Sequence, residues 1–417
     1  MRTTDPPASP VCREVRDRRG RVYRVGESDA DLLGYGRIRM AVLSWVGMAG
    51  VSCAAYAYAV AGPGDVRVWV LAQAAVAFPA GRLRDGGRLP ARVAVTGGAC
   101  GVLGACLAPA VAPGTGAAYL TAGVIGGAGA GLVCASCLTL PGRWYPERRG
   151  GPTGFVVSGC AVGAVPVLLG LGPAGLTVTG AGACLVAAAA GRLLREPPRD
   201  WWPPHPHPLR VPADPVARRV LAKNPPAVRQ HTPGEAARTP ALWLTALCLL
   251  GVAGAVVLDV RLLAPLGQAA PLVAGAAAGA AAGALTDLVE RRTALAAACL
   301  LLGAAQFALP AAGRAGGAPL VAGAVTVGFT GAAVLALVTA MTADHFGENH
   351  SASVHGVLAA AWLLPVPLNS PHPSAYVLAG CSGLACAAPA LFLKAPGRLS
   401  ARRVLPNPHP LGEEMAS

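Results

Sequence analysis

The stretch Arg143-Trp144-Tyr145-Pro146-Glu147-Arg148-Arg149-Gly150 decides how this chain of 417 residues folds. It is short, basic and broken by proline, and it lies between two long apolar runs, residues 117–140 and 152–172. An apolar run of about 20 residues is long enough to cross a bilayer as a helix. Two such runs joined by a cluster of arginines are typical of a cytoplasmic turn between two membrane helices.

The composition of the whole chain supports a membrane protein. Hydrophobic residues make up 54% of it and charged residues only 13%, whereas a soluble domain carries about 25% charged residues. The net charge of +14 alone would be compatible with nucleic-acid binding. However, all Lys and Arg except Arg67, Arg261 and Arg314 fall in the two tails, in alternate loops or at the adjoining helix ends. This is the positive-inside pattern, so we expect a lipid bilayer as partner and no nucleic acid.

Apolar runs broken by charge, glycine or proline recur along the whole sequence. They predict an all-α membrane protein with twelve transmembrane helices in two six-helix halves. The predicted spans are 38–61, 66–83, 91–111, 117–140, 152–172, 174–194, 240–261, 268–286, 293–313, 318–342, 353–369 and 374–394.

The polar segments define the expected domain layout, a multi-pass protein of the bacterial plasma membrane with both termini in the cytoplasm. We expect a cytoplasmic tail (1–37), a six-helix bundle (38–194), a Pro-rich cytoplasmic linker (195–239), a second bundle (240–394) and a second tail (395–417). The proline density around 197–208 favours an extended connector. Its two histidines, His205 and His207, leave open a partner-binding or metal-binding role.

The stretch 143–150 and the small residues that follow it, 150–164, resemble the R-W-[YF]-P-[DE]-R-R-G-x-x-[ST]-G segment of the oxalate/formate antiporter family within the major facilitator superfamily. Two further segments resemble that family: Arg238-Thr239-Pro240-Ala241-Leu242-Trp243, and residues 343–358, which begin Ala-Asp-His-Phe-Gly. The resemblance implies the superfamily fold, in which two pseudo-symmetric halves carry solute by alternating access.

A degenerate repeat closes the second helix of each half. Gly81 to Asp85 and Gly283 to Asp287 both read G-x-x-x-D and resemble the G-x-x-x-D-R-x-G-R-R loop of the superfamily. Both copies depart from it, with Gly86 in one and Leu288 in the other where a basic residue is expected. The resemblance implies a gate of charged pairs, while the alternative is a set of ordinary charged helix ends. The candidate gating residues are Asp85, Arg88, Arg143, Glu147, Arg148, Arg149, Asp287, Arg291 and Arg292.

Glycines recur every four residues in three spans, which places each set on one helix face. We interpret these faces as close packing between helices rather than as substrate contacts. The sets are Gly123, Gly127 and Gly131; Gly159 and Gly163; and Gly275, Gly279 and Gly283.

Polar and aromatic residues in the spans are candidates for the solute site, which lies between the halves in this architecture. Tyr56-Ala57-Tyr58 resembles the Tyr-Ala-Trp segment of the family's first helix, but tyrosines also mark membrane interfaces. Buried glutamines could bind a ligand or join two helices. The candidate substrate residues are Tyr56, Tyr58, Gln73, Trp243, Gln306 and Trp362.

One departure from the family bears on the substrate. Members that handle dicarboxylates carry an Arg and a Lys at the places that Gly279 and Trp362 occupy here. Since a dianion without a counter-charge suffers a large desolvation cost, we do not expect oxalate/formate exchange. We interpret Asp259 and Arg261 as interfacial charges at the outer end of their span. His355 is a candidate for proton coupling or simply a polar boundary residue.

Two functions remain open. The first is a monomeric secondary transporter of a small organic solute, a monocarboxylate or similar metabolite, coupled to protons or to a counter-solute. The second is a membrane scaffold or sensor that retains the fold without transport. The sequence offers no enzyme motif, and we expect no metal and no cofactor.

Overall fold

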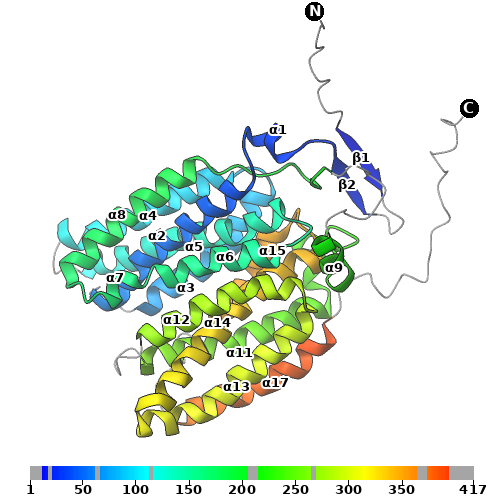
Figure 1. The fold of residues 1–417 in the computed structure, drawn as a ribbon. Coiled ribbons are helices and arrows are strands. Elements are labelled where there is room, and N and C mark those ends of the chain that lie inside the picture. The colour runs from blue at the N-terminus through cyan, green and yellow to red at the C-terminus, as the bar shows by residue number, and fades with distance from the viewer. Residues whose placement is uncertain are drawn as a thin grey trace, which may run out of the picture.

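Long helices in two bundles make up most of the fold (Figure 1). The computed structural model describes residues 12–16, 21–61, 66–111, 116–204, 215–263, 269–363 and 373–393. The first half contains α2 (Ile38–Ala61), α3 (Val66–Asp85), α4 (Ala91–Val111), α5 (Gly116–Trp144), α6 (Gly150–Val162), α7 (Val165–Leu168) and α8 (Pro173–Arg192). The second half contains α11 (Pro240–Leu263), α12 (Ala269–Ala281), η1 (Ala282–Asp287), α13 (Arg291–Ala315), α14 (Gly317–Phe346), α15 (Ser351–Ala359), η2 (Ala360–Leu363) and α17 (Pro373–Phe392).

The twelve predicted spans agree with these helices. Two spans consist of consecutive helical segments, α6 with α7 and α12 with η1, and the span at 353–369 is described as far as residue 363. By length and apolar composition, nine of the described helices are able to cross a membrane. The helix α3 is not among these nine, and its last turn carries Arg82, Arg84 and Asp85.

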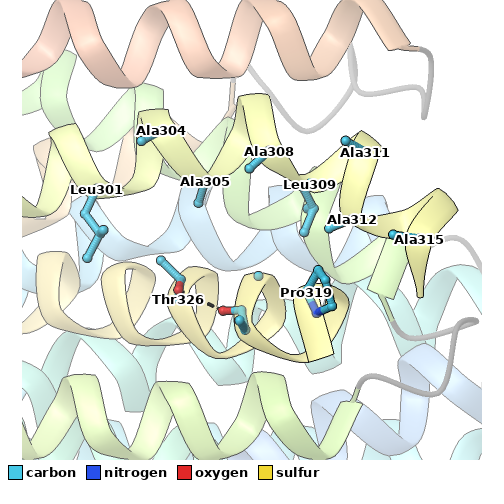
Figure 2. Close-up of a pocket in the computed structure, with 12 residues that line it drawn as sticks. Leu301, Ala304, Ala305, Ala308, Leu309, Ala311, Ala312, Ala315, Pro319 and Thr326 are labelled. Atoms are coloured by element: carbon cyan, nitrogen blue, oxygen red, sulfur yellow. Dashed lines mark hydrogen bonds between the residues drawn. The ribbon is translucent and has the colours of Figure 1, made fainter. Parts of the chain in front are cut away.

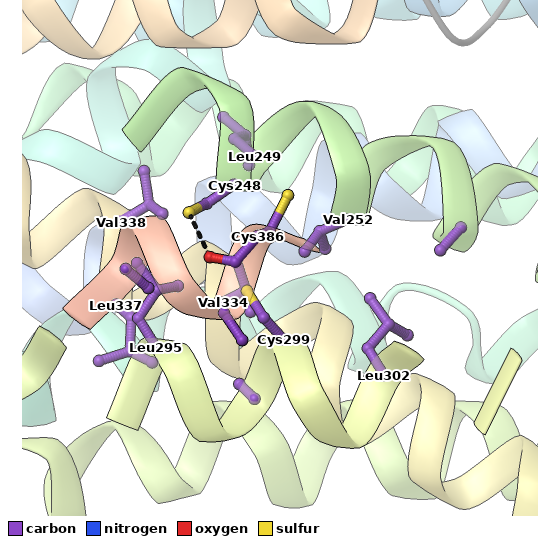
Figure 3. Close-up of a cluster of buried hydrophobic side chains, with 14 of the residues drawn as sticks. Cys248, Leu249, Val252, Leu295, Cys299, Leu302, Val334, Leu337, Val338 and Cys386 are labelled. Carbon is purple, nitrogen blue, oxygen red and sulfur yellow. Dashed lines mark hydrogen bonds between the residues drawn. The ribbon is translucent and has the colours of Figure 1, made fainter. Parts of the chain in front are cut away.

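Each half has its own apolar core. In the second half, side chains from α11, α13, α14 and α17 meet around Cys248, whose thiol donates a hydrogen bond of 3.4 Å to the carbonyl of Cys386 (Figure 3). The core of the first half gathers residues of α2, α4, α5 and α8, and Ala280 and Ala336 of the second half pack against it. Most of the apolar surface is therefore buried within each half, where it stabilises that half.

The glycine faces pack helix against helix, as expected. Gly127 and Gly131 of α5 lie against the α3 backbone, and Gly275 and Gly279 of α12 lie against the α14 backbone. Gly283 lies against α6 in the other half, at a place where a side chain would collide with the backbone of Gly154. The missing side chains allow backbones to approach this closely.

The N-terminal tail and the linker contain structure that the sequence did not predict. Strands β1 (Arg13–Arg16) and β2 (Val22–Val25) form an antiparallel hairpin, followed by α1 (Asp29–Leu33). The linker contains two short helices, α9 (Pro215–Lys223) and α10 (Pro233–Ala237), besides its Pro-rich part. His205 and His207 lie outside the described residues. Hairpin and linker lie at one end of the two bundles (Figure 1).

Candidate functional site: an interface between the halves

Asp85 fixes the first turn of a helix in the opposite half. It is the last residue of α3, and its Oδ2 accepts hydrogen bonds from the backbone N of Ser353 at 2.7 Å and from the Ser353 Oγ at 2.5 Å. Free N–H groups and the positive end of the dipole at a helix start favour a carboxylate there. Gly87, with φ 74°, ends α3 just beyond the aspartate. Gly81, one turn earlier, leaves room for the α15 backbone at Ala352.

Asp287 makes the same kind of contact in the opposite direction. It ends η1 in the second half, and its two carboxylate oxygens accept from the backbone N of Gly150 at 2.8 Å and of Gly151 at 3.0 Å. These two glycines begin α6 in the first half. The degenerate G-x-x-x-D repeat thus places one carboxylate of each half on a helix start of the other.

Arg149 and Arg291 connect these contacts through a ladder of buried charges. Arg149, 1% exposed, donates to the carboxylates of Asp344 and, at 2.6 Å, Glu348. Arg291 donates to Asp344 and, at 2.5 Å, to Asp287. Buried charges are tolerated only when they are paired and hydrogen-bonded, as they are here. We call the contacts of Asp85, Asp287, Arg149 and Arg291 with their partners the charged-end interface.

The hairpin and the linker add a third arginine to this interface. Arg21, 4% exposed, donates to Glu348 at 2.5 Å and to the carbonyl of Ala227 at 3.0 Å. Its guanidinium lies over the rings of Tyr23 and Trp202. Burial disfavours ionisation of Glu348, but Arg21 and Arg149 outweigh it and hold the pKa of this carboxyl below its ordinary value. Three buried carboxylates, those of Asp287, Asp344 and Glu348, thus face three buried arginines.

The linker lies directly beside the hairpin. The backbone N of Arg24 donates to the carbonyl of Asp200 at 2.8 Å, and the backbone N of Trp202 donates to the carbonyl of Arg24 at 2.9 Å. Trp201, 2% exposed, packs edge-on against Trp144 of α5 with ring centroids 5.1 Å apart. Segments expected to be a tail and an extended connector therefore cover the charged-end interface.

The remaining candidate gating residues pair within one half or face solvent. Arg143 of α5 donates to Glu196 at 3.2 Å, and Arg37 donates to Glu147 at 2.6 Å. Arg88 is exposed, Arg148 is 45% exposed by its side chain, and Arg292 pairs with Glu290. Sequence reasoning missed Arg21, Arg84, Glu196, Asp344, Glu348 and Ser353 as members of these networks. Asp344 and Glu348 were within the segment that resembles the family, and their charge beside a membrane span was the available signal.

The described contacts of the candidate substrate residues in the first half are made within that half. Tyr58 is 8% exposed and packs on Trp69 with ring centroids 5.1 Å apart. Tyr56 is half-buried in the same helix, and the Gln73 amide contacts the Cys134 thiol at 3.5 Å. All of these contacts stay within the first half.

The described candidates of the second half contact that half or the adjoining linker. Trp243 is 61% exposed and donates to the carbonyl of Ala237 at 2.7 Å. Gln306, fully buried, donates to Asp259 at 2.6 Å. Trp362 belongs to η2, and its side chain is outside the described part of the chain. His355 is 5% exposed, two residues after Ser353, and its Nδ1 has no hydrogen-bond partner among the described residues.

One sequence interpretation changes, and Gly279 is accounted for by helix packing. Asp259 is not an interfacial charge, because its exposed fraction is 0% and its partner is Gln306 of a neighbouring helix. Gly279 lies against the α14 backbone at Phe329. A long side chain there would collide with α14 rather than reach the space between the halves.

A cavity of about 570 Å³ lies within the second half between α13 and α14 (Figure 2). Figure 2 shows it lined by small and aliphatic side chains, including Leu301, Ala305, Leu309, Pro319 and Thr326. It is apolar and far from the charged-end interface, so it does not supply the polar groups that fix a solute's orientation.

The model of the Major Facilitator Superfamily matches residues 66–369, and the chain belongs to this superfamily. Its fold is similar to that of the proton:xylose symporter XylE (TM-score 0.63, 12% identity, 84% of this chain and 94% of that one). It is also similar to that of FucP in the outward conformation (TM-score 0.59, 13% identity, 85% of this chain and 98% of that one). A third similar fold is that of the human organic anion transporter MFSD10 (TM-score 0.58, 17% identity, 86% of this chain and 97% of that one). No curated protein sequence matched the chain. The protein is thus a multi-pass membrane protein with the secondary-transporter fold, while the narrower likeness to oxalate/formate antiporters stays a prediction.

Proposed function

We propose that this protein is a secondary transporter that moves a small organic solute across the plasma membrane by alternating access. The observation that carries the proposal is the charged-end interface. Each half has its own apolar core, whereas the hydrogen bonds between the described parts of the two halves all lie at this one end. Polar contacts can be exchanged for water at little net cost, while an apolar core cannot. Two stable units joined by exchangeable contacts are suited to rocking about a central site.

The charged end is proposed to face the cytoplasm, because the basic residues of the chain concentrate there. In this orientation the path to the cytoplasm is closed by the two carboxylates and by the arginine ladder. Asp85 and Asp287 hold the starts of α15 and α6, so transport requires that both helix starts exchange their carboxylate for water. The hairpin and linker would add to the stability of this closed state.

The proposed solute is a monocarboxylate or a neutral metabolite. In the described spans, the buried arginines Arg84, Arg143 and Arg291 lie in the first or last turns at the charged end and already have carboxylate partners. A dianion in the middle of the protein would therefore lack a fixed counter-charge. Sugars belong in the test panel as well, since two solved proteins of similar fold are described as a xylose symporter and as FucP, a fucose:proton symporter.

Counterflow in proteoliposomes tests the proposal. Vesicles loaded with an unlabelled monocarboxylate, sugar or neutral metabolite should accumulate the labelled form through the wild-type protein. Asp85→Asn should change the rate, because it weakens one contact that must break and re-form in each cycle. Arg88→Ala, at an exposed position, is the matched control. Saturable exchange of at least one solute supports transport.

The scaffold reading is the second candidate, because the candidate substrate residues lie in separate places in the two halves. It predicts no flux with any solute in the panel, together with specific capture of a partner by the linker, 195–239. That combination would replace the transport proposal.

A further inference from the structure

A cluster of buried polar groups lies inside the second half, away from the charged-end interface. Asp259 of α11 and Gln306 of α13 each have an exposed fraction of 0%, and Tyr376 of α17 is 4% exposed. Gln306 is fifteen residues along α13 from Arg291, so a rise of about 1.5 Å per residue places it roughly 22 Å from the charged end. The three helices pack against one another. Asp259 is close enough to Tyr376 to act on it electrostatically.

The hydrogen bonds of this cluster are incomplete in a specific way. Gln306 Nε2 lies 2.6 Å from Asp259 Oδ2, while Asp259 Oδ1, Gln306 Oε1 and the Tyr376 hydroxyl have no partner among the described residues. Two of the three unpartnered atoms are acceptors and the third is a hydroxyl that can donate to only one of them, so the cluster is one donor short. If the amide is turned over, a protonated Asp259 donates to the Gln306 carbonyl and supplies the missing donor.

Among the described residues, no charged group neutralises Asp259. In the described part of the chain no arginine or lysine forms an ion pair with it, and the side chain of Arg261 is outside that part. Arg314, further along α13, is exposed. The other titratable groups on the helices that pack against α11 are Asp344 and His345 of α14, His355 of α15 and Arg291 and Arg292 of α13, all toward the charged end, together with Glu235 of α10 and thiols of α13 and α17. A carboxylate in apolar surroundings without a cation takes up a proton instead.

We propose that Asp259, with Gln306 and Tyr376, is a proton-binding site in the second half, and that its proton favours the conformation closed at the charged end. In this conformation Asp259 has no contact with water. Any conformation that admits water to it holds the proton less tightly, so protonation favours the closed one. That the proton is coupled to solute movement rests on the proposed transport function, but its binding does not.

Infrared spectroscopy of the protein in lipid vesicles tests the binding itself. Wild type should show the carbonyl band of a protonated carboxyl group at mildly acidic to neutral pH, where an exposed aspartate is ionised. The band should vanish in Asp259→Asn and shift in Gln306→Leu, which removes its hydrogen-bond partner. It should be unchanged in Glu290→Gln, the control at a half-exposed carboxylate. A spectrum that is the same in wild type and Asp259→Asn at every pH would overturn the proposal.

Hydrogen exchange at the distant interface tests the conformational effect without any solute. After correction for the intrinsic pH dependence of exchange, the Ser353 amide of wild type should lose protection as pH rises through the titration of Asp259, by up to about tenfold per pH unit. Asp259→Asn, which carries no charge, should keep the amide protected throughout. Identical pH profiles in the two proteins would refute the conformational part. If both experiments succeed and no solute moves in counterflow, the transport proposal fails and the proton site remains.

Discussion

Replacement of Arg149 by alanine should open the charged-end interface. Arg149 is 1% exposed and donates to two carboxylates, so its loss leaves three buried acids opposite two arginines. Loss of one partner of a buried pair costs about 3–5 kcal/mol. Asp344 keeps Arg291 and Glu348 keeps Arg21, so we expect the lower bound, about 3 kcal/mol. This corresponds to a roughly 150-fold shift from the closed conformation toward the open one.

Hydrogen exchange of the Ser353 amide measures this shift. Ser353 belongs to the other carboxylate contact, so its exchange reports opening of the whole interface rather than a local change beside residue 149. In Arg149→Ala the amide should exchange roughly 150-fold faster. In Arg148→Ala, where the side chain is 45% exposed and 3.9 Å from Glu147, the rate should change less than about threefold. An unchanged Ser353 rate in Arg149→Ala would refute the view that the contacts form one unit.

Three further predictions concern the same amide. Arg21→Ala removes a charged hydrogen bond worth about 2 kcal/mol, so exchange of the Ser353 amide should rise roughly 30-fold. Arg24→Ala, at a part-exposed pair with Glu27, should have little effect on this rate. Equal exchange rates in both variants would argue against a role for the hairpin. Gly81→Val would place a Cβ 2.7 Å from the Ser353 backbone N, so the interface should fail to close and the Ser353 amide should lose its protection from exchange. Gly97→Ala, with open space at its Cβ, is the control. Retained protection of the amide in Gly81→Val would contradict the packing. The pKa of Glu348 lies below its ordinary 4.5, so the stability that this carboxylate adds to the closed conformation is present above pH 4.5 and is lost as pH falls through the lower pKa of the closed state. Wild type should therefore open in acid, whereas Glu348→Gln, which already lacks this contribution, should show no such transition. An acid transition shared by both proteins would assign it to another group.

Local pattern and local composition predict the spans and the fold. Apolar runs and the distribution of arginine locate the helices, because each span must bury its own backbone polar groups in lipid. The G-x-x-x-D repeat also indicates where the two aspartates end their helices. It does not identify their partners, since the Ser353 amide is 268 residues from Asp85 and becomes its neighbour only when the halves assemble.

The misinterpreted residues share the same cause. Arg21 was assigned to a tail, because nothing local indicates that a hairpin brings it to Glu348, 327 residues away. Asp259 was assigned to the membrane interface from its place near the end of an apolar run. Its burial depends on Gln306 from another helix, which the sequence around Asp259 does not reveal.

A distance between the halves tests the central claim, that the charged-end interface closes reversibly, most directly. Spin labels on unnatural amino acids at Arg88 and Arg292, one in each half, avoid the twelve native cysteines. Electron–electron double resonance in liposomes should give mainly one short distance in wild type, and a second, longer population that becomes dominant in Arg149→Ala. A single distance that is the same in both proteins would contradict the account.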